Sequence, residues 1–67
     1  MNVIINGKKE DIELASPTVA ALLNLYVLDG KAVIVERNGQ IVSKNDLAMT
    51  PIADGDRIEI VHFVGGG

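Results

Sequence analysis

The C-terminal stretch is the part of the sequence whose residue types suggest chemistry. The apolar run Val61-His62-Phe63-Val64 passes directly into Gly65-Gly66-Gly67, where the sequence ends. Glycine lacks Cβ and chain ends are seldom packed, so we expect residues 65–67 to form a flexible arm that can enter a narrow channel. The reactive atom of such an arm is the carboxyl carbon of Gly67. An inert, frayed end is the simpler alternative, and composition alone favours it.

Side-chain chemistry is sparse in the rest of the chain. With no cysteine, the sequence offers no disulfide, thiolate ligand, nucleophilic thiol or persulfide. His62 is the single histidine, and no catalytic arrangement accompanies it, so we interpret it as a surface residue. Asp54-Gly55-Asp56 lacks the spacing of a calcium loop and predicts a solvated turn. We therefore expect a protein that is not an enzyme and that binds no metal or cofactor itself.

The composition predicts one small soluble domain. The chain has 67 residues and a net charge of −3, from six basic and nine acidic residues. Scattered basic residues on an acidic chain disfavour nucleic acid and favour a basic protein surface as partner. The apolar runs are shorter than the roughly 20 residues that span a bilayer, and no signal segment opens the sequence. We expect a cytoplasmic protein with no membrane contact, built as a domain over residues 1–64 and a tail over 65–67.

Two hairpins are predicted from their turn residues. Asn6-Gly7 and Asn38-Gly39 are the dipeptides that best supply the two positive φ angles of a type I′ turn, which predicts hairpins over residues 2–14 and 31–42. In the first hairpin Ile5 should face Lys8. This register places alternate apolar residues on the core face and leaves Ile4 on the outer face.

The register of the second hairpin pairs Arg37 with Gln40 and Val35 with Val42. Its first strand contains Val33-Ile34-Val35 and is partly apolar on both faces, which is compatible with burial on both sides. The pattern leaves open which of these residues point inward. Residues 44–47 are expected to form one helical turn in the polar link that follows.

A helix is predicted between the hairpins. Either Ser16 or Thr18 can serve as its N-cap, and the pattern does not decide between them. Gly30 is expected to end the helix in the left-handed conformation. The stripe that faces the sheet has the spacing i, i+3, i+4, i+7 and consists of Val19, Leu22, Leu23 and Tyr26.

The last strand, over residues 57–63, alternates in polarity. If Ile58 and Ile60 point into the core, Val61 and Phe63 are exposed beside the tail and form a docking surface for a partner. A bulge near His62 would exchange the two faces.

The order of the elements predicts the fold class. To bury its isoleucines, the last strand should lie centrally, beside and parallel to the first strand, with the polar link as the crossover. This is an α+β fold of the β-grasp, or ubiquitin-like, type: a mixed sheet with one main helix across one face. In it Ile4 is expected to join Val61 and Phe63 in one partner-binding patch.

Three stretches of the sequence resemble the ThiS family of sulfur carriers in thiamine biosynthesis, and the resemblance covers essentially the whole chain. They are Thr18-Val19 with Leu22-Leu23, the run from Val33 to Gly39, and the run from Asp54 to Gly67. The Asp-Gly-Asp turn, the apolar strand and the terminal Gly-Gly are its specific parts. The family fold is a β-grasp, and its final Gly-Gly corresponds to Gly66-Gly67, with Gly65 as an additional glycine.

The resemblance implies a modification of Gly67. A ubiquitin-activating-type adenylating enzyme would use ATP and Mg²⁺ to convert the Gly67 carboxylate into an acyl-adenylate. Sulfur from the persulfide of a cysteine desulfurase would then displace AMP. The resulting thiocarboxylate, a 1-thioglycine, would donate its sulfur to thiazole synthase.

Other functions share this fold and tail. One is a sulfur carrier for molybdopterin or for tRNA thiolation, and another is a ubiquitin-like modifier joined to target lysines. A third is a binding module whose tail has no role.

Overall fold

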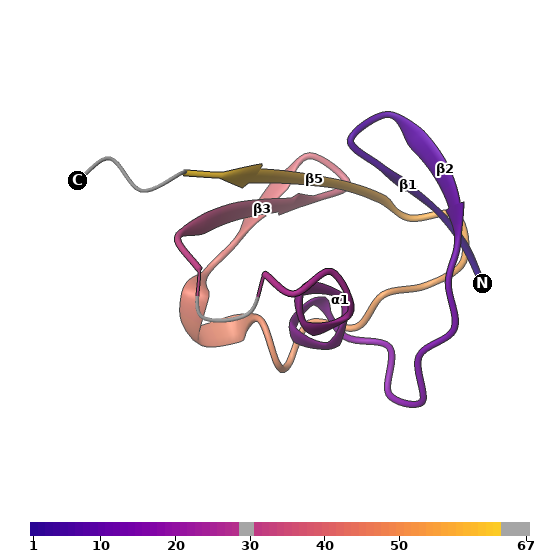
Figure 1. Cartoon of the computed structure of the whole chain (residues 1–67), viewed down its shortest axis with the longest axis horizontal. Coiled ribbons are helices and arrows are strands. Elements are labelled where there is room, and N and C mark those ends of the chain that lie inside the picture. Colours follow the sequence, from indigo (N-terminus) through magenta and orange to yellow (C-terminus); the bar gives the residue numbers. More distant parts are fainter. Residues whose placement is uncertain (29–30, 64–67) are drawn as a thin grey trace.

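The computed structural model describes residues 1–28 and 31–63 of the chain. Over these residues it contains a five-stranded mixed sheet with helix α1 across one face (Figure 1). The elements are β1 (Asn2–Ile5), β2 (Lys8–Asp11), α1 (Val19–Leu25), β3 (Val33–Arg37), β4 (Gln40–Val42), the 3₁₀ helix η1 (Lys44–Asp46) and β5 (Arg57–His62). Within this part of the chain no helix is long and apolar enough to cross a membrane.

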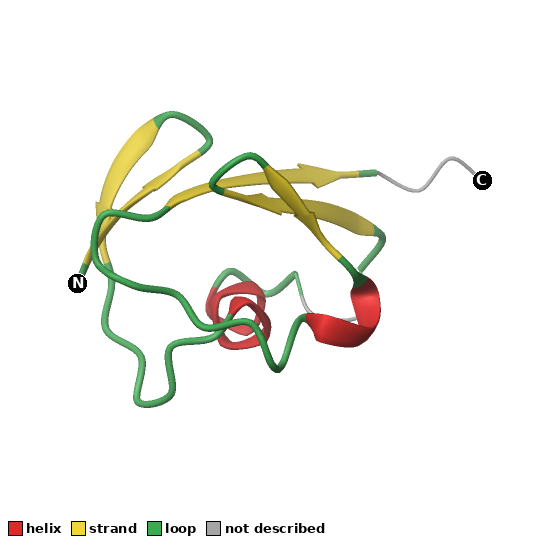
Figure 2. Cartoon of the chain, turned by 180° about the vertical axis from the view of Figure 1, so that it is seen from behind, coloured by secondary structure: helices red, strands yellow, loops and turns green. Residues whose placement is uncertain are grey.

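Strand β5 lies in the middle of the sheet. The strand order is β2-β1-β5-β3-β4, with β5 parallel to β1 and antiparallel to β3. Seen from behind, the link from η1 to β5 crosses the helix side of the sheet before the chain enters the central strand (Figure 2). The β-grasp topology predicted from the element order is confirmed.

Both hairpins have the predicted turns and registers. The turn residues have positive φ angles, 51° and 80° at Asn6 and Gly7, and 51° and 84° at Asn38 and Gly39. Ile5 pairs with Lys8 in the first hairpin, and in the second the pairs are Arg37↔Gln40 and Val35↔Val42. Asn-Gly accepts two successive left-handed residues at little steric cost, and this fixes each register at its turn.

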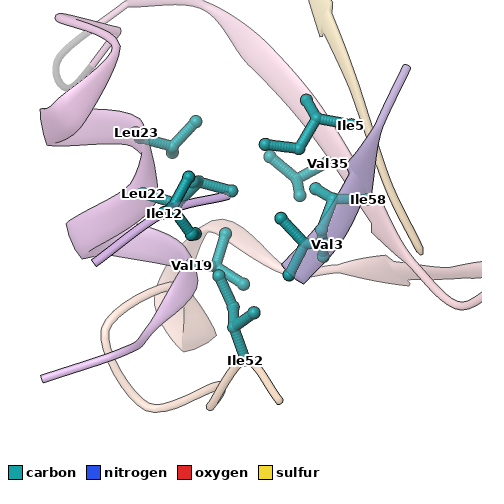
Figure 3. Packing of buried hydrophobic residues seen from close by; sticks show 9 residues of the cluster. All are labelled: Val3, Ile5, Ile12, Val19, Leu22, Leu23, Val35, Ile52 and Ile58. Carbon is teal, nitrogen blue, oxygen red and sulfur yellow. The ribbon is translucent and has the colours of Figure 1, made fainter. Parts of the chain in front are cut away.

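The core lies between α1 and the sheet (Figure 3). Its buried residues are Val3, Ile5, Ile12, Val19, Leu22, Leu23, Val35, Ile52 and Ile58. The orientation that the sequence left open is settled: Val35 is buried and Val33 is half-buried, whereas Ile34 points to the outer face and is 43% exposed. Strand β3 is therefore not buried on both sides, because no layer of the described chain covers its outer face.

Helix α1 begins as one of the two alternatives predicted and ends earlier than predicted. Thr18 is the N-cap, and its Oγ1 accepts a hydrogen bond from the N–H of Ala21 at 3.1 Å. The helix ends at Leu25, and Val27 adopts the left-handed conformation with φ 59°. The helix was predicted to continue to a cap at Gly30, and this prediction is wrong because the helix ends at Leu25. Gly30 itself lies outside the described residues.

The end of α1 is a Schellman motif with valine in the position that glycine usually takes. The N–H of Val27 donates to the carbonyl of Asn24 at 3.0 Å, and the N–H of Leu28 donates to the carbonyl of Leu23 at 2.7 Å. Leu28 then packs against the core. A left-handed conformation costs a β-branched residue about 1–2 kcal/mol, and burial of Leu28 offsets this cost.

The link between β4 and β5 packs on the start of α1. Its 3₁₀ helix, η1, lies where a helical turn was predicted. The N–H of Val19 donates to the carbonyl of Thr50 at 3.0 Å, and the N–H of Ile52 donates to the carbonyl of Pro17 at 2.8 Å. These bonds hold the buried side chain of Ile52 in the core beneath the sheet.

Candidate functional site

Strand β5 positions the candidate site, because it leads directly to the C-terminal residues. On its β3 side the pairing runs from Arg37↔Ile58 to Val33↔His62, and the N–H of Phe63 donates to the carbonyl of Ala32 at 2.9 Å. Backbone hydrogen bonds therefore hold this part of the chain in the sheet as far as Phe63, the last described residue. No bulge interrupts the pairing at His62, so Val61 and Phe63 lie on the outer face, as the alternation predicted. Gly65, Gly66 and Gly67, the predicted tail and modification site, lie outside the described residues.

On the other side of β5, the side chain of an asparagine hydrogen-bonds to the strand beyond the point where β1 ends. Strand β1 pairs with β5 at Ile4↔Arg57 and Ile5↔Ile58. Beyond these pairs, the N–H of Ile60 donates to Oδ1 of Asn6 at 2.7 Å, and Nδ2 of Asn6 donates to the carbonyl of Ile60 at 3.2 Å. The amide of Asn6 thus extends the sheet by one pair. Sequence reasoning identified Asn6 as a turn residue but missed this second role.

A buried carboxylate holds the beginning of β5. Asp56 is 7% exposed and accepts hydrogen bonds from Nε of Arg37 at 2.8 Å, Nδ2 of Asn38 at 3.0 Å and the N–H of Ala53 at 2.8 Å. The prediction of a solvated turn is therefore wrong for Asp56. It holds for the neighbouring Asp54, which is exposed. The long-range partners of Asp56 come from β3 and its turn, and the local Asp-Gly-Asp pattern does not show them.

Burial by itself raises the pKa of Asp56. The hydrogen bonds from Ala53, Asn38 and Arg37, together with the charge of the Arg37 guanidinium, outweigh this effect and leave the pKa below its ordinary value. Asp56 is therefore ionised at neutral pH and has a structural role. Among the described residues, no three histidine, aspartate or glutamate side chains gather as a metal site would require.

The outer face of β3, β4 and β5 carries an exposed apolar patch. Val61 and Phe63 are 52% and 53% exposed, as the alternation predicts. Val61 pairs directly with Ile34, and Ile41 of β4 is 72% exposed on the same face. We call Ile34, Ile41, Val61 and Phe63 the outer patch. Ile34 of β3 and Ile41 of β4 were not among the predicted site residues, although the predicted register of the hairpin already placed them on one face.

Ile4, the third residue expected in the partner-binding patch, lies elsewhere on this face. It pairs with Arg57 of β5 and with Lys9 of β2, and it is half-buried. Along β5, the outward-facing Glu59 separates Arg57 from Val61. The register therefore does not bring Ile4 to Val61 and Phe63. The structure joins Val61 to Ile34 instead.

His62 is exposed and pairs with Val33 through the backbone. It lies on the opposite side of β5 from Val61 and Phe63. In the part of the chain that the structure describes, no group of three histidine, aspartate or glutamate side chains that could hold a metal ion includes it. The arrangement that the geometry offers is thus a central strand, hydrogen-bonded on both sides and flanked by an apolar surface, whose sequence continues into the C-terminal glycines.

Comparison with known proteins shows the family. The family model described as the ThiS family matches residues 3–67. The chain belongs to the ThiS family of sulfur carriers. The sulfur carrier protein ThiS of Bacillus subtilis is 46% identical over 63 residues, which cover 94% of this chain and 96% of that protein. The ThiS match confirms the predicted family.

Solved structures of ThiS proteins have the same fold. The crystal structure of the thiamine biosynthesis protein ThiS from Geobacter metallireducens superimposes with a TM-score of 0.81 at 36% identity, and the match covers 100% of both chains. The solution structure of a thiamine biosynthesis protein from the same organism gives a TM-score of 0.80 at 38% identity, covering 100% of this chain and 88% of that one.

Two longer relatives contain a ThiS-like segment. The thiazole synthase of Paramagnetospirillum magneticum is 46% identical over 67 residues, and that of Magnetococcus marinus is 34% identical over 67 residues. Each match covers 100% of this chain but 20% of the thiazole synthase. The chain therefore spans about a fifth of the length of these two proteins.

Proposed function

We propose that this ThiS-family chain carries sulfur as a thiocarboxylate on Gly67 and delivers it for thiazole formation in thiamine biosynthesis. The observation that carries the proposal is the match to the B. subtilis sulfur carrier over nearly the full length of both proteins. The absence of cysteine supports it, because the terminal acyl group is then the natural place to hold sulfur. The chain acts as a protein cosubstrate, and other proteins catalyse the steps.

The chemistry begins with activation of the carboxylate. A ubiquitin-activating-type adenylating enzyme, which binds ATP and Mg²⁺, joins an oxygen of the Gly67 carboxylate to the α-phosphate, and pyrophosphate leaves. The terminal sulfur of a persulfide, generated by a cysteine desulfurase, attacks the carbonyl carbon, and AMP leaves. A thiol then reduces the resulting S–S bond and releases the thiocarboxylate. A side chain on Gly66 or Gly67 would hinder approach to the carbonyl.

Thiazole synthase is the acceptor that the comparisons favour. Two thiazole synthases contain a segment related to the whole of this chain, and fusion of this kind keeps two cooperating proteins at high effective concentration. We assign the docking of partners to the outer patch, whose exposed Val61 and Phe63 lie just before the C-terminal residues. Ile4 stays a separate candidate contact, because the register places it beside Arg57.

Intact-mass spectrometry tests the proposal. The protein is incubated with ATP, Mg²⁺, a ubiquitin-activating-type enzyme, a cysteine desulfurase and cysteine, and the expected product has one oxygen replaced by sulfur. A variant that lacks Gly67 is the control and should not gain this mass. An unchanged mass with an enzyme that adenylates the B. subtilis ThiS would contradict the proposal. Covalent ladders on a denaturing gel would instead indicate a protein modifier.

A further inference from the structure

A second apolar surface lies on the helix side of the sheet. A hollow of about 260 Å³ opens between α1 and the β3–β4 hairpin, and η1 borders it. Its apolar wall includes Leu28, Val33, Val42 and Leu47. All four are half-buried: they pack against the core and remain partly open to solvent. The hollow is therefore an accessible apolar surface, and it is continuous with the core.

The hollow and the outer patch lie on opposite faces of the sheet. Val33 and Val35 of β3 line the hollow, whereas Ile34 between them belongs to the outer patch. Successive side chains of a strand point to opposite faces. A protein bound in the hollow would thus leave the outer patch free for another partner.

Two lysines give the mouth of the hollow a positive charge. Lys31 and Lys44 both line it and both are exposed. Within residues 1–28 and 31–63 the ion pairs join the Met1 amino group to Asp11 and Arg37 to Asp56, so neither lysine takes part in one. Because the whole chain carries a net charge of −3, this pair of lysines is a local feature that favours acidic groups.

The size of the hollow indicates what can occupy it. Sites for small molecules usually enclose about 300–1,000 Å³, so a hollow of 260 Å³ lies just below that range and suits one large apolar side chain. We propose that the hollow docks a protein partner through a segment that inserts one large apolar side chain and carries aspartate or glutamate beside it. Burial of the apolar side chain supplies affinity, and the contacts of Lys31 and Lys44 orient the segment.

A peptide titration tests this inference without reference to Gly67 or to sulfur transfer. The probe is the capped pentapeptide glycine-glutamate-phenylalanine-glutamate-glycine, added to the ¹⁵N-labelled full chain and followed by amide chemical shifts. We expect saturable shifts at Leu28, Val33, Val42 and Leu47, with weak affinity because the probe is short. A matched peptide with glutamine in place of both glutamates should bind more weakly, and added salt should reduce the difference.

Charge-reversal variants supply the matched comparison. The double variant Lys31→Glu/Lys44→Glu should weaken peptide binding about tenfold. The control Lys8→Glu/Lys9→Glu makes the same change of charge on β2, at the far edge of the sheet, and should leave binding unchanged. All four side chains are exposed, so both variants should keep the amide spectrum of the folded protein.

Three results would overturn the inference. One is the absence of saturable shifts at the residues of the hollow, including the case in which the shifts centre on the outer patch. Another is an equal loss of affinity in the Lys8→Glu/Lys9→Glu control. The third is binding of 4-phenylbutyrate at these residues as tightly as the peptide, which would assign the hollow to a small amphiphilic anion.

Discussion

The side chain of Asn6 pairs with the backbone of Ile60 as a strand residue would. Oδ1 of Asn6 accepts from the N–H of Ile60 at 2.7 Å, and Nδ2 donates to the carbonyl of Ile60 at 3.2 Å. The same asparagine has φ 51° in the turn between β1 and β2. One residue thus reverses the chain and also supports the central strand beyond the last residue of β1.

We expect Asn6→Gly to destabilise the protein by about 1 kcal/mol, because glycine accepts the turn geometry but loses both side-chain bonds. Asn6→Ala should cost about 1 kcal/mol more, because alanine is also disfavoured at positive φ. Urea denaturation of both variants gives the two costs separately. An Asn6→Gly variant as stable as the parent would show that solvent replaces the bonds to Ile60 without loss.

Acid should weaken the fold through Asp56. Because the pKa of Asp56 is lower in the folded state, its contribution to stability is complete above the unfolded pKa, near 3.9, and is lost as the pH falls through the folded pKa. Asp56→Asn should remove this part of the acid dependence and cost about 2–3 kcal/mol at neutral pH. Urea midpoints between pH 2 and pH 7 measure both effects.

The control for Asp56 is Asp46→Asn, which changes an exposed carboxylate. It should leave the acid dependence close to that of the parent. If both variants flatten the acid profile equally, the network around Asp56 is not its source.

Val27→Gly should stabilise the protein by about 0.5–1 kcal/mol. Val27 has φ 59° and is 73% exposed, so glycine relieves backbone strain at little loss of packing, although it also adds entropy to the unfolded chain. Thermal unfolding measures the gain. Val27→Ala is the matched control and should gain much less, because alanine keeps the steric conflict. A Val27→Gly variant less stable than the parent would contradict the strain argument.

Phe63→Glu and Ile34→Glu should each weaken binding of the adenylating enzyme by about tenfold or more, if the outer patch is the docking surface. Isothermal titration calorimetry measures the affinity, and the amide spectrum checks the fold. Met49→Glu is the control, since Met49 is apolar, 76% exposed and outside the patch. An affinity that falls equally in the Met49→Glu variant would show a general effect of charge.

Gly67→Ala should slow formation of the acyl-adenylate while leaving stability unchanged, because a methyl group beside the carbonyl hinders its approach to ATP. Pyrophosphate release in the presence of the adenylating enzyme measures the rate. An unchanged rate would argue that the enzyme does not enclose the terminal residue closely. Thermal unfolding provides the check on stability.

Local patterns predicted most of the fold. The two Asn-Gly turns set the hairpin registers, and the two inward isoleucines of the last strand required a central position for it. Three features depend on contacts distant in sequence and were not predicted. Leu28 is half-buried and packs against the core, and Val27 before it adopts the left-handed conformation at the end of α1. The partners of Asp56 come from β3 and its turn.

The third feature concerns the candidate site. Exposure of Val61 and Phe63 followed from alternation within β5, whereas the place of Ile4 depended on the register between β1 and β5. A parallel pair of strands has no tight turn that fixes its register. The sequence pattern therefore predicted that β1 lies beside β5, but it did not predict which residue of β5 lies beside Ile4. Ile34 became the neighbour of Val61 through the antiparallel pairing of β3 and β5.

The central place of β5 also determines how the protein responds to force. A pull directed along β5 from its C-terminal side acts parallel to the strand, while its hydrogen bonds to β3, to β1 and to Asn6 run across it. The load is then shared by all of these bonds in shear, and they cannot be broken one at a time from the end. The domain is thereby suited to resist unravelling when it is pulled from its C-terminal side.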